Sequence, residues 1–203
     1  MYVQGTLLGS AVDPVADAAF GGLTRHQLDA RSWVDHAPEW LAGHDIVFHE
    51  LCERLAWRQR TVTMYERRLP EPRLTSWWRE GDGDPPTPLL TEMGAMLSER
   101  YGVTFDSIGS NLYRDGADSV AWHGDRHRHT MTDPIVAIVS VGARRPFRLR
   151  PRQRVTDRRS HSFDLGGGDL LVMGGSCQHD WEHTVPKQRI AAPRISITYR
   201  HGM

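Results

Sequence analysis

The second half of the chain, from about Phe105 onward, is a series of short apolar runs separated by glycine, aspartate and proline. The runs have the length and the β-branched content of strands, and we predict strands over 108–113, 135–141, 147–149, 162–165, 170–173 and 194–200. Asp115-Gly116 and the three glycines at 166–168 supply turns. Many short strands at this spacing are typical of a sandwich or barrel. The predicted fold is therefore mainly β with flanking helices (α+β), a double-stranded β-helix or jelly roll.

The first half mixes predicted helix and loop. Asp45 can cap a helix that runs to about Trp57, and Pro88 can begin a second helix that Gly102 ends. A length of 203 residues suits one domain with a sizeable core. We expect a single domain over 1–203, with a helical and substrate-lid region at 1–104 and the jelly-roll core at 105–203.

Charge and cysteine content narrow the class of protein. Lys+Arg and Asp+Glu are equal at 25 each, which argues against a protein that coats nucleic acid by bulk electrostatics. Eight arginines nevertheless fall between Arg144 and Arg159, so a basic face can exist on a neutral protein. Cys52 and Cys177 lie far apart and make no disulfide framework. We expect a cytoplasmic monomer without membrane association, because the chain has no apolar stretch of about 18 residues.

One pair of polar residues suggests a metal site. In an extended segment, residues two apart point the same way, so His123 and Asp125 can face one ion, and His183 follows sixty positions later. Two imidazoles and one carboxylate that leave coordination positions open are the facial arrangement of non-haem Fe(II) oxygenases. A zinc site built from Cys177, His179 and His183 is the alternative, but it lacks an evident fourth ligand.

The C-terminal run from Arg194 to Arg200 alternates strictly in polarity. One face carries Arg194, Ser196, Thr198 and Arg200, and the other carries apolar side chains and Tyr199. An edge strand with a wet face is the default reading of such a run. Two inward-facing arginines would instead bind carboxylates through charge-assisted hydrogen bonds. Asn111 and Tyr113 form a second pair two residues apart, which can add neutral donors from another strand.

Taken in order, these segments resemble the AlkB family of Fe(II)/2-oxoglutarate-dependent nucleic-acid dioxygenases. The resemblance covers roughly Pro72 to Arg200 and includes Asn111-Leu-Tyr-Arg-Asp-Gly116, Trp122-His-Gly-Asp125, Asp180-Trp-Glu-His183 and the run from Arg194 to Arg200. It implies that His123, Asp125 and His183 bind Fe(2+). It also implies that 2-oxoglutarate is held by a polar set, with Arg194 on its distal carboxylate and O2 as the oxidant; the set is Asn111, Tyr113, Arg194, Ser196 and Arg200.

The implied reaction is oxidative dealkylation of N-alkylated bases, such as N1-methyladenine and N3-methylcytosine, in DNA. A base inside a duplex cannot reach such a pocket, so the nucleic acid must be single-stranded or have the base flipped out. We expect Trp78, Trp122 and the ring of His123 to stack on the base, although Trp77 or Trp78 could equally belong to the core. Arg73, Arg145 and the arginines from Arg148 to Arg159 are expected to contact phosphates.

Three departures from the family pattern concern the substrate. The segment 79–88, where the family usually has an aromatic hairpin as a lid, contains no aromatic residue. His127 stands where an acidic residue is common, and Ser196 stands where an asparagine is usual. RNA, including a tRNA loop, is therefore an alternative substrate. A 2-oxoglutarate oxygenase with a substrate that is not a nucleic acid, and a binding module without activity, are further alternatives.

Overall fold

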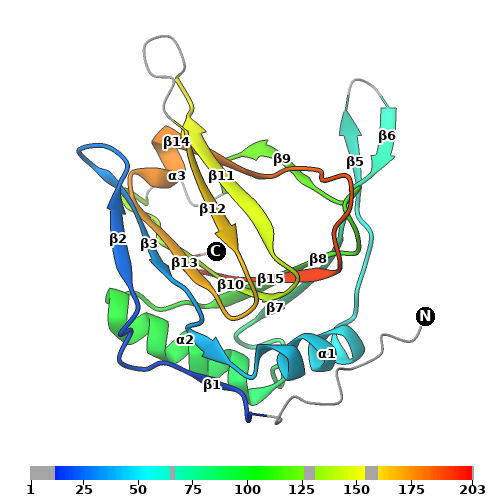
Figure 1. The fold of residues 1–203 in the computed structure, drawn as a ribbon, viewed down its shortest axis with the longest axis horizontal. Coiled ribbons are helices and arrows are strands. Elements are labelled where there is room, and N and C mark those ends of the chain that lie inside the picture. The colour runs from blue at the N-terminus through cyan, green and yellow to red at the C-terminus, as the bar shows by residue number, and fades with distance from the viewer. Residues whose placement is uncertain (1–11, 65–66, 126–130, 154–159, 203) are drawn as a thin grey trace.

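Two antiparallel sheets face each other in the protein (Figure 1). The large sheet has the strand order β2-β3-β13-β10-β15-β8-β7, and the small sheet has the order β12-β11-β14-β9. The structure is a computed structural model that describes residues 12–64, 67–125, 131–153 and 160–202. The strands of the large sheet are β2 (Thr24–Gln27), β3 (Ser32–Ala37), β13 (Leu170–Gly175), β10 (Val136–Gly142), β15 (Arg194–Arg200), β8 (Ser107–Tyr113) and β7 (Leu74–Arg79). Those of the small sheet are β12 (His161–Leu165), β11 (Arg145–Pro151), β14 (Trp181–Val185) and β9 (Val120–His123).

The remaining elements lie outside these two sheets. The helices are α1 (His44–Arg54), α2 (Pro88–Tyr101) and the short α3 (Cys177–Asp180). Two small antiparallel pairs are formed by β1 (Val15–Ala16) with β4 (Leu41–Ala42) and by β5 (Thr61–Met64) with β6 (Arg67–Pro70). Within the described residues, no helix combines the length and the apolar character that crossing a bilayer requires.

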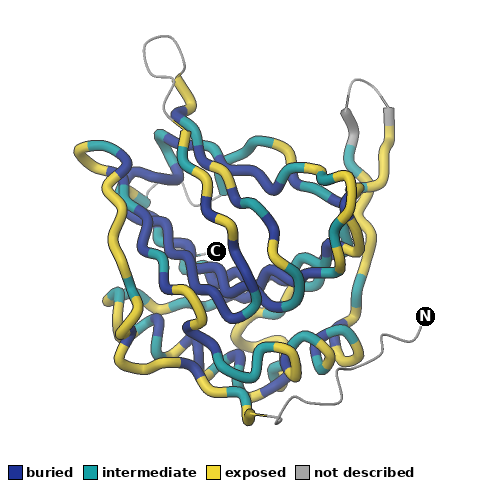
Figure 2. Tube along the Cα trace, in the orientation of Figure 1, coloured by how far each residue is buried: buried dark blue, intermediate teal, exposed yellow. Residues whose placement is uncertain are grey.

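The alternation of side chains along the strands creates two separate cores. On the outer face of the large sheet, Val139, Ile195 and Ile197 pack against α1 and α2, whose buried residues include Leu51 and Met93. Figure 1 shows both helices on this one side of the sheet, and Figure 2 shows the buried chain between them and the facing strands. Between the two sheets lies a second apolar cluster, with members such as Ile138, Phe147, Leu149, Leu171 and Trp181. The predicted jelly roll with helices on one side is confirmed.

Helix ends follow the predicted signals closely. Pro88 is the first residue of α2, and Gly102 ends it in the left-handed conformation with a φ of 66°. The first helix begins one residue before Asp45, with Gly43 as its N-cap, so Asp45 lies in the first turn rather than at the cap. It ends at Arg54 and not at Trp57.

The first half of the chain differs from the expected helical region. β2, β3 and β7 join the large sheet, so residues on both sides of position 105 build the same layer. β3 was not predicted from the sequence. Four of its six residues are buried and they lie on both faces of the strand, so polar and apolar residues do not alternate along it.

Candidate metal centre

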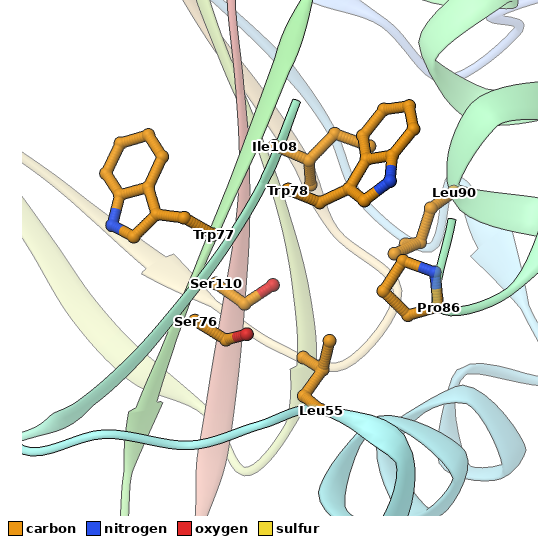
Figure 3. Close-up of a pocket in the computed structure, with 8 residues that line it drawn as sticks. All are labelled: Leu55, Ser76, Trp77, Trp78, Pro86, Leu90, Ile108 and Ser110. Carbon is orange, nitrogen blue, oxygen red and sulfur yellow. The ribbon is translucent and has the colours of Figure 1, made fainter. Parts of the chain in front are cut away.

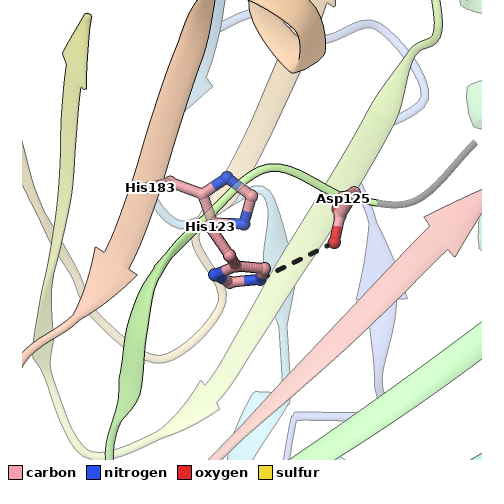
Figure 4. Close-up of side chains that lie close together, drawn as sticks. All are labelled: His123, Asp125 and His183. Carbon is pink, nitrogen blue, oxygen red and sulfur yellow. Dashed lines mark ion pairs between the residues drawn. The ribbon is translucent and has the colours of Figure 1, made fainter. Parts of the chain in front are cut away.

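Three predicted metal-binding side chains meet between the two sheets. His123 ends β9, Asp125 follows it after Gly124, and His183 lies in the middle of β14, directly opposite His123 in the strand register. One ligand atom from each of the three lies within 4.8 Å of the others (Figure 4). The imidazole centroids are 4.3 Å apart, and Nε2 of His123 lies 3.8 Å from Oδ1 of Asp125. Two nitrogen atoms and one oxygen atom therefore converge on one point.

The protonation of these groups suits metal binding. Burial lowers the pKa of His183 to about 3, so its imidazole is neutral and its lone pair can bind a cation. Burial alone would raise the pKa of Asp125, but the positive charge of Arg200 and the hydrogen bond it donates, together with the two neighbouring histidines, hold it well below its usual range. Nδ1 of His123 lies 2.9 Å from the carbonyl oxygen of Ala121. Because a carbonyl can only accept, this contact places the proton on Nδ1 and leaves Nε2 for a metal.

The zinc alternative finds no support in the described residues, where the one group of three or more potential ligands is His123, Asp125 and His183. Cys177 is buried, and burial raises the pKa of its thiol far above the usual range. The ring nitrogen Nε2 of His179 lies 3.2 Å from the carbonyl oxygen of Met131. An open three-ligand site with two imidazoles and one ionised carboxylate matches the donor set that iron takes in oxygenases.

Arg194 lies fully buried on the inner face of the large sheet. Its Nε donates a hydrogen bond to Oγ of Ser140 over 2.8 Å, while Nη1 and Nη2 are buried without a hydrogen-bond partner among the described residues. Burial lowers the pKa of the guanidinium to about 10, which still leaves it charged at neutral pH. A buried cation with two free nitrogen atoms is a site for a carboxylate that would form a charge-assisted pair.

Arg200 lies at the other end of the same strand face. Its Nη2 donates to Oδ1 of Asp125 over 3.0 Å, and its Nη1 is buried without a hydrogen-bond partner in the described part of the chain. The two arginines therefore lie at the two ends of one strand face, Arg200 at the metal centre and Arg194 remote from it. Between them, Ser196 lies opposite Asn111 and Arg194 lies opposite Tyr113 in the register of β15 and β8. The structure thus brings the whole predicted polar set to one face of the sheet.

Ser140 and Phe147 also belong to this site, although the sequence did not single them out. Phe147 stacks on the ring of His183, with centroids 5.2 Å apart and an interplanar angle of 22°. The sequence could have identified Ser140 as a site residue, because it is the single hydroxyl-bearing residue within the otherwise apolar run of β10. Phe147 looks like any core residue of a strand, so only the facing strand reveals its role.

The predicted substrate contacts are largely not where they were expected. Trp78 packs among the residues between the large sheet and the helices, a position that does not favour the predicted stacking on a base. Trp77, its neighbour, points to the opposite face of β7 and is 44% exposed (Figure 3). The guanidinium carbon of Arg200 lies 5.0 Å from the Trp77 ring, on the side of the metal centre. A small pocket between Trp78, Leu90 and Ile108 lies on the helix side instead.

Two of the arginines expected to contact phosphates, Arg145 and Arg73, are engaged within the protein. Arg145 is completely buried and donates hydrogen bonds to the carbonyl oxygens of Asp115, Asp118 and Pro186, so it cannot reach a phosphate. Nε of Arg73 donates to Oδ1 of Asn111 over 3.0 Å, and its side chain is 19% exposed. Arg73 therefore binds Asn111, a member of the predicted polar set, and presents little surface to a nucleic acid.

Trp122 was expected beside the substrate, but the guanidinium of Arg150 covers its ring, 3.9 Å from the centroid. It lies on the face of the small sheet that points away from the metal centre, because it precedes His123 in the strand. His127, at the position where the family pattern differs, lies outside the described residues.

Comparison with known proteins gives one consistent result. A family model described as the 2OG-Fe(II) oxygenase superfamily matches residues 35–200. The chain is 35% identical over 173 residues to the alpha-ketoglutarate-dependent dioxygenase alkB homolog 3 of Bos taurus, and the match covers 77% of this chain and 60% of that protein. It is 29% identical over 189 residues to the DNA oxidative demethylase ALKBH2 of Arabidopsis thaliana, with 75% and 60% covered. The chain thus spans about 60% of the length of these relatives.

Two solved structures share the fold. The structure of OsALKBH1 matches with a TM-score of 0.60 at 14% identity, over 87% of this chain and all of the other. A prolyl-4-hydroxylase from Pseudomonas putida matches with a TM-score of 0.55 at 16% identity, over 82% of this chain and 90% of the other. At such identities the likeness concerns the fold alone.

Proposed function

The chain belongs to the 2OG-Fe(II) oxygenase superfamily, within its AlkB family, and from that membership we propose that the protein is an Fe(II)- and 2-oxoglutarate-dependent dioxygenase that removes alkyl groups from nucleic-acid bases. The observation that carries the proposal is the combination of two groups between the sheets. His123, Asp125 and His183 gather within 4.8 Å of one another, and the inner face of the large sheet holds the guanidinium of Arg194, whose Nη1 and Nη2 have no partner among the described residues.

The residues present fit both implied groups. His123, Asp125 and His183 would hold Fe(2+), and Arg194 would bind the distal carboxylate of 2-oxoglutarate, with Asn111, Tyr113, Ser196 and Arg200 along its length. When bound, iron and 2-oxoglutarate supply the oxidation of an alkyl carbon by O2, with succinate and carbon dioxide formed from the co-substrate. The protein's own part is to position these groups and to exclude water. Phe147 and Leu149, buried beside His183, form the apolar wall that does so.

The substrate side of the pocket suits a base that has left its stack. Trp77 offers a half-exposed aromatic face, and the side chain of His123 is 40% exposed. Two rings that flank an opening can hold a planar base by stacking. We infer that Trp77, rather than Trp78 or Trp122, is the stacking residue.

Cationic side chains that could meet phosphates precede this strand. Arg58, Arg60 and Arg68 are exposed on or beside the β5–β6 pair, and Arg58 forms a bridge to Thr75 of β7. They therefore lie on the segment that leads to Trp77. These residues replace the buried Arg145 in our proposal for phosphate contacts.

DNA is the proposed polymer, with direct reversal of base alkylation as the role, because relatives of the chain carry the name DNA oxidative demethylase. RNA is the second candidate, because the name of the relatives called alkB homolog 3 specifies neither DNA nor RNA. The segment 79–88, where the family usually has its aromatic lid, contains no aromatic residue that would favour one of the two polymers.

The test is release of formaldehyde from N1-methyladenine and N3-methylcytosine in matched DNA and RNA oligonucleotides. Purified protein is supplied with Fe(II), ascorbate and 2-oxoglutarate, and His123→Ala serves as the control. Release that depends on His123 and is faster on DNA supports the proposal, whereas faster release on RNA favours the second candidate. Slow succinate formation without formaldehyde from any of the four would keep the oxygenase and reject nucleic acid as its substrate.

A further inference from the structure

Three side chains lie together on the outer face of the small sheet, directly behind the candidate metal centre. Arg150 of β11 donates from Nε and Nη2 to Oε2 of Glu182, over 3.1 and 2.9 Å. The same guanidinium lies 3.9 Å from the centroid of the Trp122 ring. Trp122 precedes His123 and Glu182 precedes His183 in the chain. We call Trp122, Arg150 and Glu182 the outer brace.

The strands that the outer brace connects are weakly joined by their backbones. β9 is the edge strand of the small sheet, and it pairs with β14 at two positions only, His183 with His123 and Val185 with Val120. The register shifts between these two pairs. A bulged edge ladder leaves the end of the strand free to twist. His123 lies at that end, where it pairs with His183 but is separated by the register shift from the next pair, Val185 with Val120.

Arg150 adds a connection through side chains, beside that of the Thr184 hydroxyl of β14, which donates a hydrogen bond to the carbonyl oxygen of Val120 in β9. It is paired with Glu182 in the register of β11 and β14, and from there it reaches over β14 to the ring on β9. In the register of β11 and β14, Arg150 pairs with Glu182, and the neighbouring Leu149 pairs with His183. Because adjacent residues of a strand point to opposite faces, β11 contacts β14 on both faces of the sheet. On the inner face, Phe147 of the same strand stacks on His183. The histidine-bearing strands are thus held from both sides by β11.

We propose that the outer brace is a positioning device that sets the spacing of His123 and His183, with Arg150 as its central residue, and thereby sets the affinity for the metal ion. The inference rests on the proposed function, because it takes the two histidines as metal ligands. It assigns to Trp122 a role other than contact with the substrate, since the face of its ring is covered by Arg150.

Burial and geometry make the brace strong enough for this role. The side chains of Arg150 and Glu182 are each 22% exposed, so solvent screens their interaction less than that of a surface pair. A planar guanidinium can stack on an indole and bond a carboxylate in its plane at the same time, which an ammonium group cannot. Lysine at position 150 would therefore keep the charge and lose the stacking contact.

The experiment measures binding of Co(II) to the metal-free protein, by calorimetry and by the visible absorption of the bound ion. For Arg150→Met we expect the dissociation constant to rise by about tenfold, the lower end of the effect of groups that orient metal ligands. Arg150→Lys should give an intermediate rise. Arg148→Met is the matched control, because Arg148 is exposed on the same strand and the same face as Arg150. The affinity of Arg148→Met for Co(II) should equal that of the wild type. The melting temperature of each metal-free variant reports its folding separately.

The outcomes separate the inference from the proposed function. A wild-type protein that does not bind Co(II), or that binds equally well as His123→Ala, would overturn the metal centre itself. If Co(II) binding by the wild type depends on His123 but Arg150→Met binds Co(II) as tightly as the wild type, the proposal for the outer brace is overturned and the metal centre is kept. If Arg150→Met does not fold, Trp122→Leu removes the same stacking contact from the other partner and should also weaken binding. An Arg150→Met, Trp122→Leu double variant should lose less than the sum of the two single losses, because both remove one contact.

Discussion

Arg200 donates a hydrogen bond to Asp125 over 3.0 Å and thereby joins the last strand of the large sheet to a candidate metal ligand that follows β9 of the small sheet. Both side chains are largely buried, at 13% and 9% exposure. The pair keeps a buried carboxylate ionised, since burial would otherwise raise the pKa of Asp125. Asp125 is thus held in its metal-binding form by a residue on the opposite sheet.

Arg200→Met should destabilise the metal-free protein, because it leaves the carboxylate of Asp125 buried without its cation. Removing one partner of a buried ion pair costs roughly 3 kcal/mol in the free energy of unfolding. Urea denaturation with a chelator present measures this loss. Addition of Co(II) should restore more stability to the variant than to the wild type, since the ion supplies the lost positive charge. The exposed Arg189→Met is the control and should not change the midpoint. Equal stability of Arg200→Met and wild type would contradict the role of the pair.

Arg194→Met should not lower the free energy of unfolding in the absence of ligands, in contrast to Arg200→Met. Arg194 is a buried cation whose two terminal nitrogen atoms have no partner in the described structure, and replacing such a group by an apolar one is neutral or stabilising by about 1 kcal/mol. In the Co(II)-loaded protein, 2-oxoglutarate should raise the melting temperature of the wild type and leave that of Arg194→Met almost unchanged. A thermal shift measured with and without the diacid tests both statements. A variant that still responds to 2-oxoglutarate would mean that the distal carboxylate binds elsewhere.

Trp77→Ala and Trp78→Ala should separate function from folding. Loss of one base-stacking ring costs about 1 to 3 kcal/mol of binding, so Trp77→Ala should weaken binding of a methylated oligonucleotide by roughly 5- to 150-fold and leave stability unchanged. Trp78→Ala removes a half-buried ring from the helix side and should cost roughly 2 kcal/mol of unfolding free energy, less than a fully buried ring. Fluorescence polarisation and urea denaturation measure the two effects. The reverse assignment of the two effects would refute the proposed placement of Trp77.

Much of the centre was predictable because its residues follow strand alternation. His123 and Asp125 are two apart in an extended segment, and Arg194 to Arg200 alternate through a whole strand. Which face points inward, however, is decided by pairing with strands that are distant in sequence. Trp77 and Trp78 are adjacent, so they point to opposite faces, and a shift of one residue in the register of β7 on β8 would exchange their roles. That register is a tertiary property, and the choice between the two tryptophans could not be made from local sequence.

Arg145 shows a second limit of sequence analysis. An arginine at the start of an arginine-rich segment has the character of a surface cation. In the structure it is fully buried because three carbonyl oxygens, at Asp115, Asp118 and Pro186, converge on its guanidinium. These carbonyls come from two loops that are far from it in the chain. Backbone acceptors leave no trace in a sequence, so their need for a buried donor is visible only in the fold.

Asp118→Asn should change the pH dependence of stability. Burial would raise the pKa of Asp118, but hydrogen bonds from the backbone and the guanidinium of Arg114 outweigh burial and lower it. A pKa that is lower in the folded state means that the stabilisation is present above the unfolded-state value of about 3.9 and is lost as the pH falls below it. The variant should therefore be less stable than the wild type by about 2 kcal/mol at pH 7, the worth of hydrogen bonds to a charged group. The difference should shrink steadily below about pH 4.

Urea midpoints from pH 7 to pH 3 measure this difference in stability, and the midpoints of the exposed control Asp84→Asn should run parallel to those of the wild type. A difference that is constant over this range would show that the charge of Asp118 does not contribute to the stability of the turn between β8 and β9.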